Sequence, residues 1–340
     1  MKLLVGGGAG FIGSNFIHYM LSKYPDISIV NYDKLTYAGN LDNLIRIAND
    51  PRYNFIQGDI ADSNKIDEVV ECFGIDTIVN FAAETHVDRS IHGGLADFVH
   101  ANVLGPQVLA EAARTHKLNL YIQISTDEVY GALELDEDRK FHEETAFAPN
   151  MPYAACKAGG DMICRSYVKT HNTPIIVTHC SNNYGPYQFP EKFIPQAIFK
   201  ALANEPIPIY GDGLYVRDWI HVMDHCSAVD TLLQKGVPGE VYNIGVDNER
   251  SNLEIMSILL EMLGKPESLL TRVQDRPGHD RRYAIDSRKI ESLGWQPFYP
   301  KSKFEAGLKH KVDWYLNNHE WVEKLRTRQN EMNPHIKVVV

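Results

Sequence analysis

The chain has 340 residues, 44% of them hydrophobic, and a formal net charge of −10. These values suffice for a large core in one large domain or two fused domains, and they argue against a general nucleic-acid-binding protein. The chain has no run of about 18 apolar residues that would indicate a membrane span, no signal-peptide-like start, and five cysteines without a CxxC pair, so we expect a cytoplasmic protein with reduced thiols and no bound metal.

The first predicted element is an apolar strand over residues 2–5, followed by a glycine-rich turn and a helix. The turn fits both GxGxxG from Gly8 and GxxGxxG from Gly7. Its glycines allow a pyrophosphate to approach backbone N–H groups at the start of the helix. A second strand over residues 27–32 ends at Asp33, 20 residues after Gly13, where a carboxylate can accept both ribose hydroxyls and would repel a 2′-phosphate. The pattern predicts an NAD site rather than an NADP site; a glycine turn without a nucleotide is the competing interpretation.

Strand-like and helix-like segments continue to alternate through the first half of the chain. Further strands are expected over residues 54–56, 77–80, 120–125 and 175–178, and long helices over 93–117 and 153–170, the first kinked by Pro106. This alternation predicts an α/β fold with a Rossmann-type, doubly wound parallel sheet that binds ligands beyond the carboxyl ends of its strands. Asp59 and the segments 80–83 and 125–128 follow such strand ends, so one site is expected to gather them.

From about residue 181 the regular alternation stops. We therefore expect residues 1–180, with a return segment near 218–246, to form an NAD-binding domain. Residues 181–217 and 247–325 would form a smaller, interleaved α+β lobe that binds the substrate, and residues 326–340 a C-terminal tail.

Tyr153 and Lys157 lie four residues apart, on one face of a predicted helix. Lys157 can favour the Tyr153 phenolate and so lower a pKa that is ordinarily about 10, which gives a general base for a sugar hydroxyl during hydride transfer. The segment 125–128 adds a hydroxyl and two adjacent carboxyls, enough for a further elimination step. A solvated loop pair is the alternative interpretation of Asp127 and Glu128.

His221 and His225, with Asp224 between them, could mimic metal ligands. The pattern lacks an HExxH motif or an evident further ligand, so no metal site is predicted.

These segments together resemble the extended short-chain dehydrogenase/reductase family and, within it, the dTDP-glucose 4,6-dehydratases. The matches run nearly end to end and include GGAGFIGSN, STDEVYG, SNNYGPYQFPEK and RPGHDRRYAID. The resemblance implies a lyase that converts dTDP-glucose to a 4-keto-6-deoxy sugar by internal hydride transfer through NAD, in deoxysugar biosynthesis. An NAD-dependent nucleotide-sugar 4-epimerase is an alternative that needs no elimination pair. A non-catalytic NAD-binding regulator is disfavoured by the joint presence of the catalytic set.

The resemblance also implies a role for each member of that set. Tyr153, assisted by Lys157, would remove the proton of the sugar 4-hydroxyl, to which Thr126 would hydrogen-bond. Glu128 would abstract the C5 proton, and Asp127 would protonate the departing 6-hydroxyl. A homodimer through the helices over 93–117 and 153–170 is implied as well, with no nucleic-acid or membrane partner.

Two further sets of residues follow from the resemblance. Those implied around NAD are Gly7, Gly10, Phe11, Ile12, Gly13, Asp33, Lys34, Leu35, Thr36, Asp59, Ile60, Ala82, Ala83, Tyr153, Lys157 and Asn183. Those implied around the nucleotide sugar are Thr85, His86, Thr126, Asn182, Lys192, Phe193, Pro208, Ile209, Tyr210, Arg217, Asn252, Asp275, Arg276, Pro277, Gly278 and His279. Arg217 and Arg276 suit a diphosphate, because a guanidinium binds phosphate through two parallel hydrogen bonds.

Overall fold

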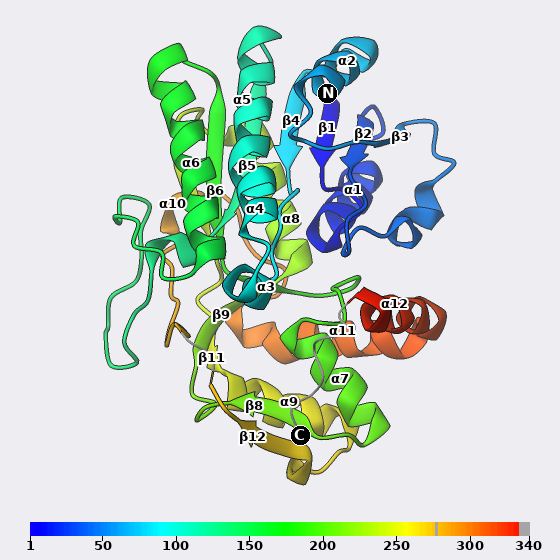
Figure 1. Ribbon diagram of the computed structural model, residues 1–340, viewed down its shortest axis with the longest axis vertical. Coiled ribbons are helices and arrows are strands. Elements are labelled where there is room, and N and C mark those ends of the chain that lie inside the picture. The colour runs from blue at the N-terminus through cyan, green and yellow to red at the C-terminus, as the bar shows by residue number, and fades with distance from the viewer. Residues whose placement is uncertain (276–277, 333–340) are drawn as a thin grey trace.

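The computed structural model describes residues 1–275 and 278–332, with side chains as far as residue 325. A seven-stranded sheet, in which every pairing is parallel, forms the upper body in Figure 1, in the order β10-β6-β5-β4-β1-β2-β3. Its strands are β1 (Lys2–Gly6), β2 (Ser28–Asp33), β3 (Tyr53–Gln57), β4 (Thr77–Asn80), β5 (Leu120–Thr126), β6 (Ile175–Cys180) and β10 (Val241–Ile244). The predicted doubly wound fold class is confirmed.

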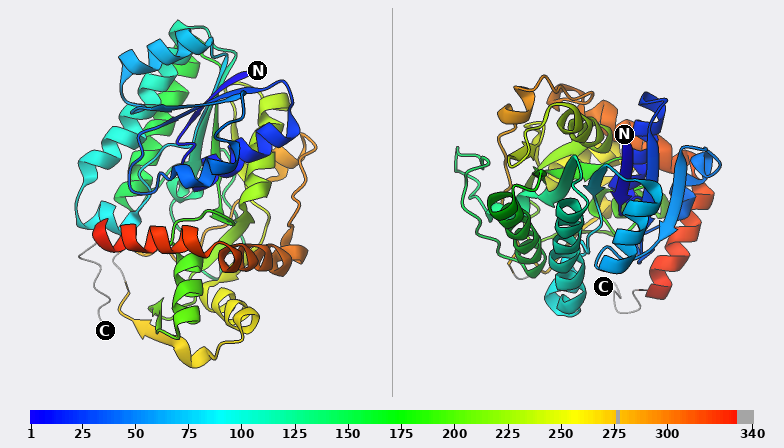
Figure 2. Two further views of the ribbon diagram at one scale, coloured as in Figure 1. Left: turned by 90° about the vertical axis from the view of Figure 1, so that its right-hand side faces the viewer. Right: turned by 90° about the horizontal axis from the view of Figure 1, so that it is seen from above.

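Helices cover both faces of this sheet, as the two views of Figure 2 show. Successive side chains of a strand point to opposite faces, so Leu3 and Val5 pack with one set of helices and Leu4 with the other. The first set is α1 (Phe11–Lys23) and α8 (Val222–Lys235), and the second is α2 (Ser63–Phe73), α5 (Gly105–Thr115) and α6 (Pro152–His171). Apolar burial on both faces explains why these strands are continuous hydrophobic runs. No helix of the described residues is long and apolar enough to cross a membrane.

The helix expected over residues 93–117 is present over residues 95–115, but it is not regular. A short helix α4 (Leu95–Val99) passes into a π-helical turn (His100–Leu104), and α5 begins at Gly105. Pro106 lies in the first turn of α5, directly after the π-helical turn. Proline has no backbone N–H, so it cannot donate the α-helical hydrogen bond to the carbonyl of residue 102, and its place beside the π-helical turn accommodates this loss. Helix α3 (Val87–His92) precedes α4, and Gly94, at φ 80, forms the left-handed turn between the two helices.

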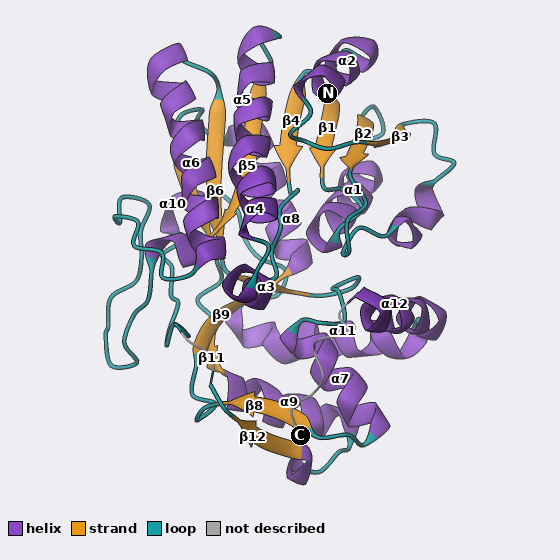
Figure 3. Cartoon of the chain, in the orientation of Figure 1, coloured by secondary structure: helices purple, strands orange, loops and turns teal. Residues whose placement is uncertain are grey.

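Smaller sheets and helices form a lobe beneath the carboxyl edge of the main sheet (Figure 3). One sheet joins β7 (Asn182–Tyr184), β9 (Val216–His221) and β11 (Glu249–Ser251), and another joins β8 (Ile207–Tyr210) and β12 (Leu270–Val273). The helices are α7 (Phe193–Ala203), α9 (Asn252–Leu263), α11 (Phe304–Asn317) and α12 (His319–Met332). Helix α12 continues past residue 325, where a tail was expected, and residues 333–340 lie outside the described residues.

Short helices complete the described chain. They are η1 (Leu41–Ile47), η3 (Asp127–Tyr130), η4 (Glu267–Leu269), α10 (Arg288–Glu291) and η5 (Lys301–Lys303).

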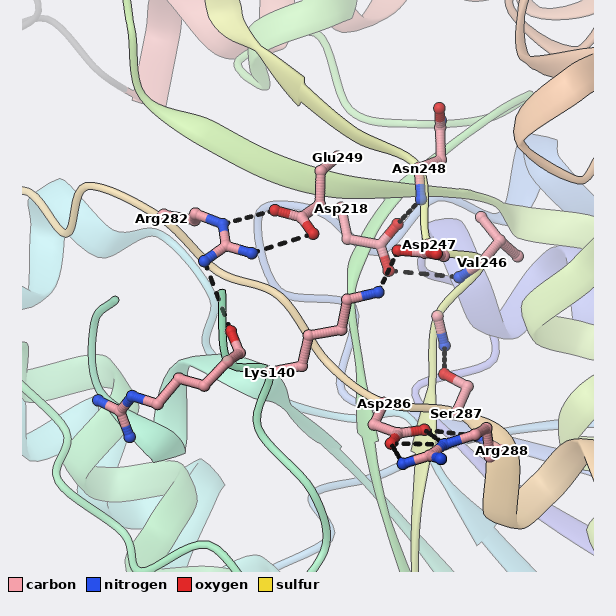
Figure 4. Close-up of polar contacts among 12 residues, drawn as sticks. Lys140, Asp218, Val246, Asp247, Asn248, Glu249, Arg282, Asp286, Ser287 and Arg288 are labelled. Atoms are coloured by element: carbon pink, nitrogen blue, oxygen red, sulfur yellow. Dashed lines mark hydrogen bonds and ion pairs between the residues drawn. The ribbon is translucent and has the colours of Figure 1, made fainter. Parts of the chain in front are cut away.

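A polar network fixes the junction between the main sheet and the lobe (Figure 4). Asp218 on β9 accepts hydrogen bonds from the backbone N–H groups of Asn248, at 2.8 Å, and Val246, at 3.3 Å. Arg282 pairs with both carboxylate oxygens of Glu249, at 2.6 and 3.2 Å. It also donates to the Glu137 carbonyl at 2.6 Å. These contacts hold β9 in place. Arg217, the residue before Asp218 on that strand, lines the cavity between the main sheet and the lobe.

Candidate active site

A cavity of about 440 Å³ lies between the carboxyl edge of the main sheet and the lobe. The ends of β1 and β4 point toward the lobe in Figure 1. All five predicted catalytic residues line this cavity: Thr126, Asp127, Glu128, Tyr153 and Lys157. Of the strand-end groups expected in one site, residues 125–128, Phe81 and Ala83 line this cavity, whereas Asp59 does not.

The end of β5 delivers three consecutive side chains to the cavity. Thr126 is the last residue of the strand and caps η3, because its Oγ1 accepts from the backbone N–H of Glu128 at 3.3 Å. The same hydroxyl donates to Asp127 Oδ1 at 3.4 Å. The strand-to-turn geometry thus places a hydroxyl and two carboxyls on one wall.

Asp127 is a buried carboxyl that favours its neutral form. Its side chain is 2% exposed, and Oδ2 has no hydrogen-bond partner among the described residues. Burial raises the pKa of Asp127 well above its ordinary value, and the nearby carboxylates of Glu128 and Asp218 add to this effect. The guanidinium of Arg217 opposes the shift. A carboxyl kept protonated in this way is equipped to donate a proton.

Tyr153 and Lys157 face the same cavity from the first turns of α6. The Lys157 ammonium donates to the carbonyl of Ile124 at 2.7 Å, and burial lowers its pKa while Asp161 acts in the opposite sense. Burial raises the pKa of Tyr153 well above its ordinary value, Glu128 adds to the shift, and the hydrogen bond with Thr126 opposes it. The net shift of the Tyr153 pKa is thus opposite to the expected lowering, because burial of the phenolate is the largest influence on it.

The glycine turn after β1 forms a close-fitting cradle of the kind that NAD requires. A Cβ on Gly13 would lie 2.4 Å from the Gly7 carbonyl oxygen, and one on Gly7, at φ 72, would lie 2.5 Å from Ala82 N. Only glycine fits at either position, so the backbone at the start of α1 stays open to a pyrophosphate. These residues fit the cofactor.

Asp33 ends β2 beside this turn. Its Oδ2 accepts from Ala9 N at 2.9 Å and its Oδ1 from Leu35 N at 2.7 Å. Each oxygen keeps a second lone pair, so the carboxylate can hold the turn and still accept two ribose hydroxyls.

The predicted NAD residues divide into two groups. Those that line the cavity are Phe11, Ile12, Ala83, Tyr153, Lys157 and Asn183. Those that lie outside its lining, at or near the ends of β1 to β4, are Gly7, Gly10, Gly13, Asp33, Lys34, Leu35, Thr36, Asp59, Ile60 and Ala82. Among the latter, Lys34 pairs with Asp59 at 2.7 Å, and Asp59 also contacts His100 Nε2 at 2.9 Å.

The predicted substrate residues come mainly from the lobe. Those that line the cavity are Thr85, His86, Thr126, Asn182, Lys192, Phe193, Pro208, Tyr210, Arg217, Asn252 and His279. Ile209 is 2% exposed in the core of the lobe, and neither Asp275 nor Gly278 contributes to the lining. Asp275 instead contacts Tyr215 and, at 2.8 Å, His279 Nδ1. Arg276 and Pro277 lie outside the described residues.

Arg217 presents its cation from β9. Its guanidinium donates to the carbonyl oxygens of Val216, at 2.8 Å, and Asp280, at 2.9 Å, and lies 4.2 Å from the centre of the Tyr283 ring. Backbone carbonyls and an aromatic face hold the planar group without neutralising its charge. The charge therefore remains available to an anionic ligand.

Several residues on the cavity wall were not predicted. They include Met151, Cys180, Ser181, Gln188, Glu191, Trp219 and Tyr283. Gln188 and Glu191 belong to the YQFPEK segment and Tyr283 to the RPGHDRRYAID segment, so their signal was present in the matched motifs. Ser181 Oγ, Asn182 Oδ1 and Trp219 Nε1 are buried polar atoms with no hydrogen-bond partner in the described part of the chain, which suits a cavity built for a polar ligand.

The candidate metal ligands do not converge. His221 Nε2 contacts His310 Nδ1 at 3.2 Å, and His225 Nδ1 contacts Asn183 Oδ1 at 3.0 Å. Asp224 instead accepts from the backbone N–H of Phe298 at 2.5 Å. Within residues 1–275 and 278–332, no group of three His, Cys, Asp or Glu side chains could hold a metal ion.

The chain is similar to known proteins over most of its length. The family model described as GDP-mannose 4,6 dehydratase matches residues 4–310. The dTDP-glucose 4,6-dehydratase of Xanthomonas campestris pv. campestris (strain B100) is 48% identical over 94% of both chains. The low-salt glycan biosynthesis protein Agl12 of Haloferax volcanii is 50% identical over 94% of this chain and 100% of that protein.

A solved structure agrees with these relatives. The dTDP-glucose 4,6-dehydratase of Bacillus anthracis, crystallised in complex with NAD, superposes with a TM-score of 0.88 at 48% identity, over 96% of this chain and 99% of that chain. The chain therefore belongs to the extended short-chain dehydrogenase/reductase family and, within it, to the dTDP-glucose 4,6-dehydratases.

Proposed function

We propose that this chain catalyses the NAD-dependent dehydration of dTDP-glucose to dTDP-4-keto-6-deoxyglucose, a step of deoxysugar biosynthesis. The observation that carries the proposal is the placement of Asp127 and Glu128 beside Tyr153 on one cavity wall. Oxidation at C4 needs only the tyrosine and the cofactor. Elimination of water across C5 and C6 needs an acid and a base as well, and this wall supplies both.

The cofactor is NAD, as in the relatives and solved structures. The residues that would hold it are those of the glycine turn, with Asp33 at the ribose and Asn183 near the nicotinamide. When bound, it supplies the acceptor and donor of hydride for the internal redox chemistry.

The protein residues move the protons. Tyr153 takes the proton of the sugar 4-hydroxyl, with Thr126 hydrogen-bonded to the same hydroxyl and the Lys157 ammonium stabilising negative charge on the phenol oxygen. The ketone formed at C4 acidifies the C5 hydrogen, which Glu128 removes as a proton. Asp127, kept neutral by burial, gives its proton to the C6 oxygen, and the C6–O bond breaks with release of water.

The lobe would hold the nucleotide diphosphate. Arg217 and Lys192 bring cations to the cavity, and phosphate oxygens accept charge-assisted hydrogen bonds from both groups. We include Arg276 in the same role. Thr85, Asn182 and Asn252 would complete the polar contacts to the sugar and base. The division into an NAD-binding domain over 1–180 and 218–246 and a substrate lobe over 181–217 and 247–325 is part of this proposal.

We further propose a homodimer that works in the cytoplasm. Large apolar side chains are exposed on neighbouring helices: Leu95 (47%) and Val99 (46%) on α4, Leu104 (41%) in the π-helical turn, and Met162 (47%) on α6. A second copy of the chain packed over these helices would cover them. The five cysteines are all free thiols, which is the state that a reducing compartment maintains.

The direct test incubates the purified protein with dTDP-glucose. We expect the alkaline absorbance of a 4-keto sugar and a product lighter by one water molecule. Glu128→Gln should abolish the loss of water while bound NAD is still reduced, because the substitution spares C4 oxidation. A product of unchanged mass with an inverted C4 centre would identify an epimerase, and no turnover of dTDP-, UDP-, CDP- or GDP-glucose would overturn the dehydratase.

A further inference from the structure

Lys311 on α11 is a lysine whose whole side chain is buried, with 0% exposure. Its ammonium donates to Gln188 Oε1 and lies 5.7 Å from the centre of the Tyr315 ring. No described carboxylate forms an ion pair with it, and the titratable groups near it include Tyr315 and the imidazole of His221, whose pKa the Lys311 charge lowers. Burial therefore lowers the pKa of Lys311 well below its ordinary value. A buried lysine without a carboxylate partner costs stability, so its contact with Gln188 calls for a functional reason.

Gln188 connects Lys311 to the wall of the active-site cavity, because it contacts both Lys311 and Asn183. Its Nε2 donates to the backbone carbonyl of Asn183 at 2.9 Å, and the backbone carbonyl of Gln188 accepts from the Tyr315 hydroxyl. The two ends of the amide are thus distinguished, because an ammonium can only donate and a carbonyl can only accept. Gln188 and Asn183 both line the cavity, whereas Lys311 and Tyr315 do not.

Asn183 is held from the opposite side as well. Its Nδ2 donates to the Ser181 carbonyl at 3.0 Å, which leaves Oδ1 to accept from His225 Nδ1 at 3.0 Å. Helix α8 therefore fixes the side chain of Asn183, and helix α11 fixes its backbone through Gln188. Removal of either link would free one side of this part of the cavity wall.

We propose that Lys311 is a positioning residue for the reaction, which through Gln188 holds Asn183 in place against the cofactor and substrate. This inference rests on the proposed function for its catalytic consequence. Lys311 itself touches neither substrate nor cofactor. A lysine with a purely structural role would affect folding and leave binding and turnover unchanged.

The test compares Lys311→Met, Gln188→Met and the double variant, with Lys309→Met as the matched control. Lys309 lies on the same helix, pairs with Asp313 at the surface and is 65% exposed. For Lys311→Met we expect kcat and the affinity of the cofactor-depleted protein for NADH each to fall about 10-fold, because small displacements at a reacting centre are costly. The Tm should be unchanged or higher, because methionine replaces a buried amino group that has no carboxylate partner among the described residues.

The link through Gln188 has its own expected result. If Lys311 acts through that amide, the double variant should be no slower than the slower single variant, because two residues of one chain of contacts are not additive. Gln188→Glu keeps an acceptor for Lys311 but loses the donor to Asn183, so it should be as impaired as Gln188→Met.

Three outcomes would overturn the inference: NADH affinity and kcat of Lys311→Met within about 2-fold of wild type, additive effects in the double variant, or a Tm loss that accounts for the lost activity. NADH affinity is measured without any sugar. A failure of the dehydratase proposal would therefore show as no turnover in wild type and leave this binding test intact.

Discussion

The carboxyl edge of the main sheet and the lobe bound the same cavity but are built in different ways. At the sheet edge, residues 126–128 are neighbours in sequence, and their positions follow from the end of one buried strand. On the lobe side, Lys192, Arg217 and Asn252 come from separate elements. The cations of Lys192 and Arg217 donate to backbone carbonyls, and Arg217 also packs on the Tyr283 ring. The first wall therefore depends on local sequence at one strand end, and the second depends on how the start of α7, β9 and α9 pack together.

The largest effect of a substitution is expected on the catalytic wall at the sheet edge. Tyr153→Phe removes the base for the 4-hydroxyl and should lower kcat by about 10³-fold, in the middle of the range for general-base catalysis. Reduction of bound NAD in a single turnover, followed by absorbance, should fall by the same factor. Tyr167→Phe on the same helix is the control and should behave as wild type. A Tyr153→Phe enzyme that reduced NAD at the normal rate would place the base elsewhere.

Asp218 connects the junction between the main sheet and the lobe to the catalytic wall of the cavity. It belongs to the polar network of the junction, and its charge raises the pKa of Asp127. Burial raises the pKa of Asp218 from 3.8 to about 6. A carboxyl whose pKa is raised on folding contributes stability below about pH 4, and this contribution is lost as the pH rises through about 6. Relative to Asp218→Asn, wild type should therefore lose about 2 kcal/mol of unfolding free energy between pH 4 and pH 7.

Denaturant unfolding of both proteins across that pH interval measures the effect, and a pH-independent difference would contradict it. The same substitution should move the alkaline limb of the kcat profile to lower pH. The reason is that it removes one of the charges that keep Asp127 protonated.

On the lobe side, Arg217→Met should weaken the binding of dTDP by about 10- to 100-fold, the range for a lost hydrogen bond to a charged group. The change should appear in KM and leave kcat nearly unchanged. Titration calorimetry with dTDP measures it directly, and Arg217→Lys should fall between the two because it keeps the charge but loses the fork and the stacking on Tyr283. A loss of kcat with normal dTDP affinity would assign Arg217 to the chemistry instead.

The smallest effect is expected far from both walls. Lys324 on α12 pairs with Asp42 at 2.9 Å, but the two side chains are 64% and 37% exposed. Lys324→Met should change the unfolding free energy by less than about 1 kcal/mol, and less still in high salt. Chemical denaturation at low and high ionic strength provides the check, and a larger or salt-independent loss would show that this pair helps to fix the lobe.

The strands of the main sheet and the site at their ends were predictable because both follow from local patterns. Apolar runs of strand length separated by helices define a parallel sheet, and Asp33, Asp59 and Thr126 to Glu128 come directly at or after its strands. The π-helical turn within the helix over 93–117 was less predictable. Pro106 marked a disturbance, but the π-helical turn depends on how the preceding residues pack.

The unpredicted part of the site depends on contacts between distant segments. Tyr283 reaches the cavity because its ring stacks under Arg217 of another strand. Lys311 occupies a position of α11 where a lysine indicates a solvated face, and only the packing of the lobe shows that it is buried against Gln188. Tyr283 stands in a matched motif, but no local pattern shows that its ring reaches the cavity, and Lys311 carries no such signal at all.

The path of the chain through the junction has a practical consequence. Strand β6 leads directly into the lobe, and β10 brings the chain back to pair with β6. A cut in the exposed turn near Leu214 would therefore leave two fragments that still share one sheet and, through α8, one core. The protein is suited to reconstitution from two separately produced fragments, and its activity on mixing them would report how faithfully the sheet reassembles.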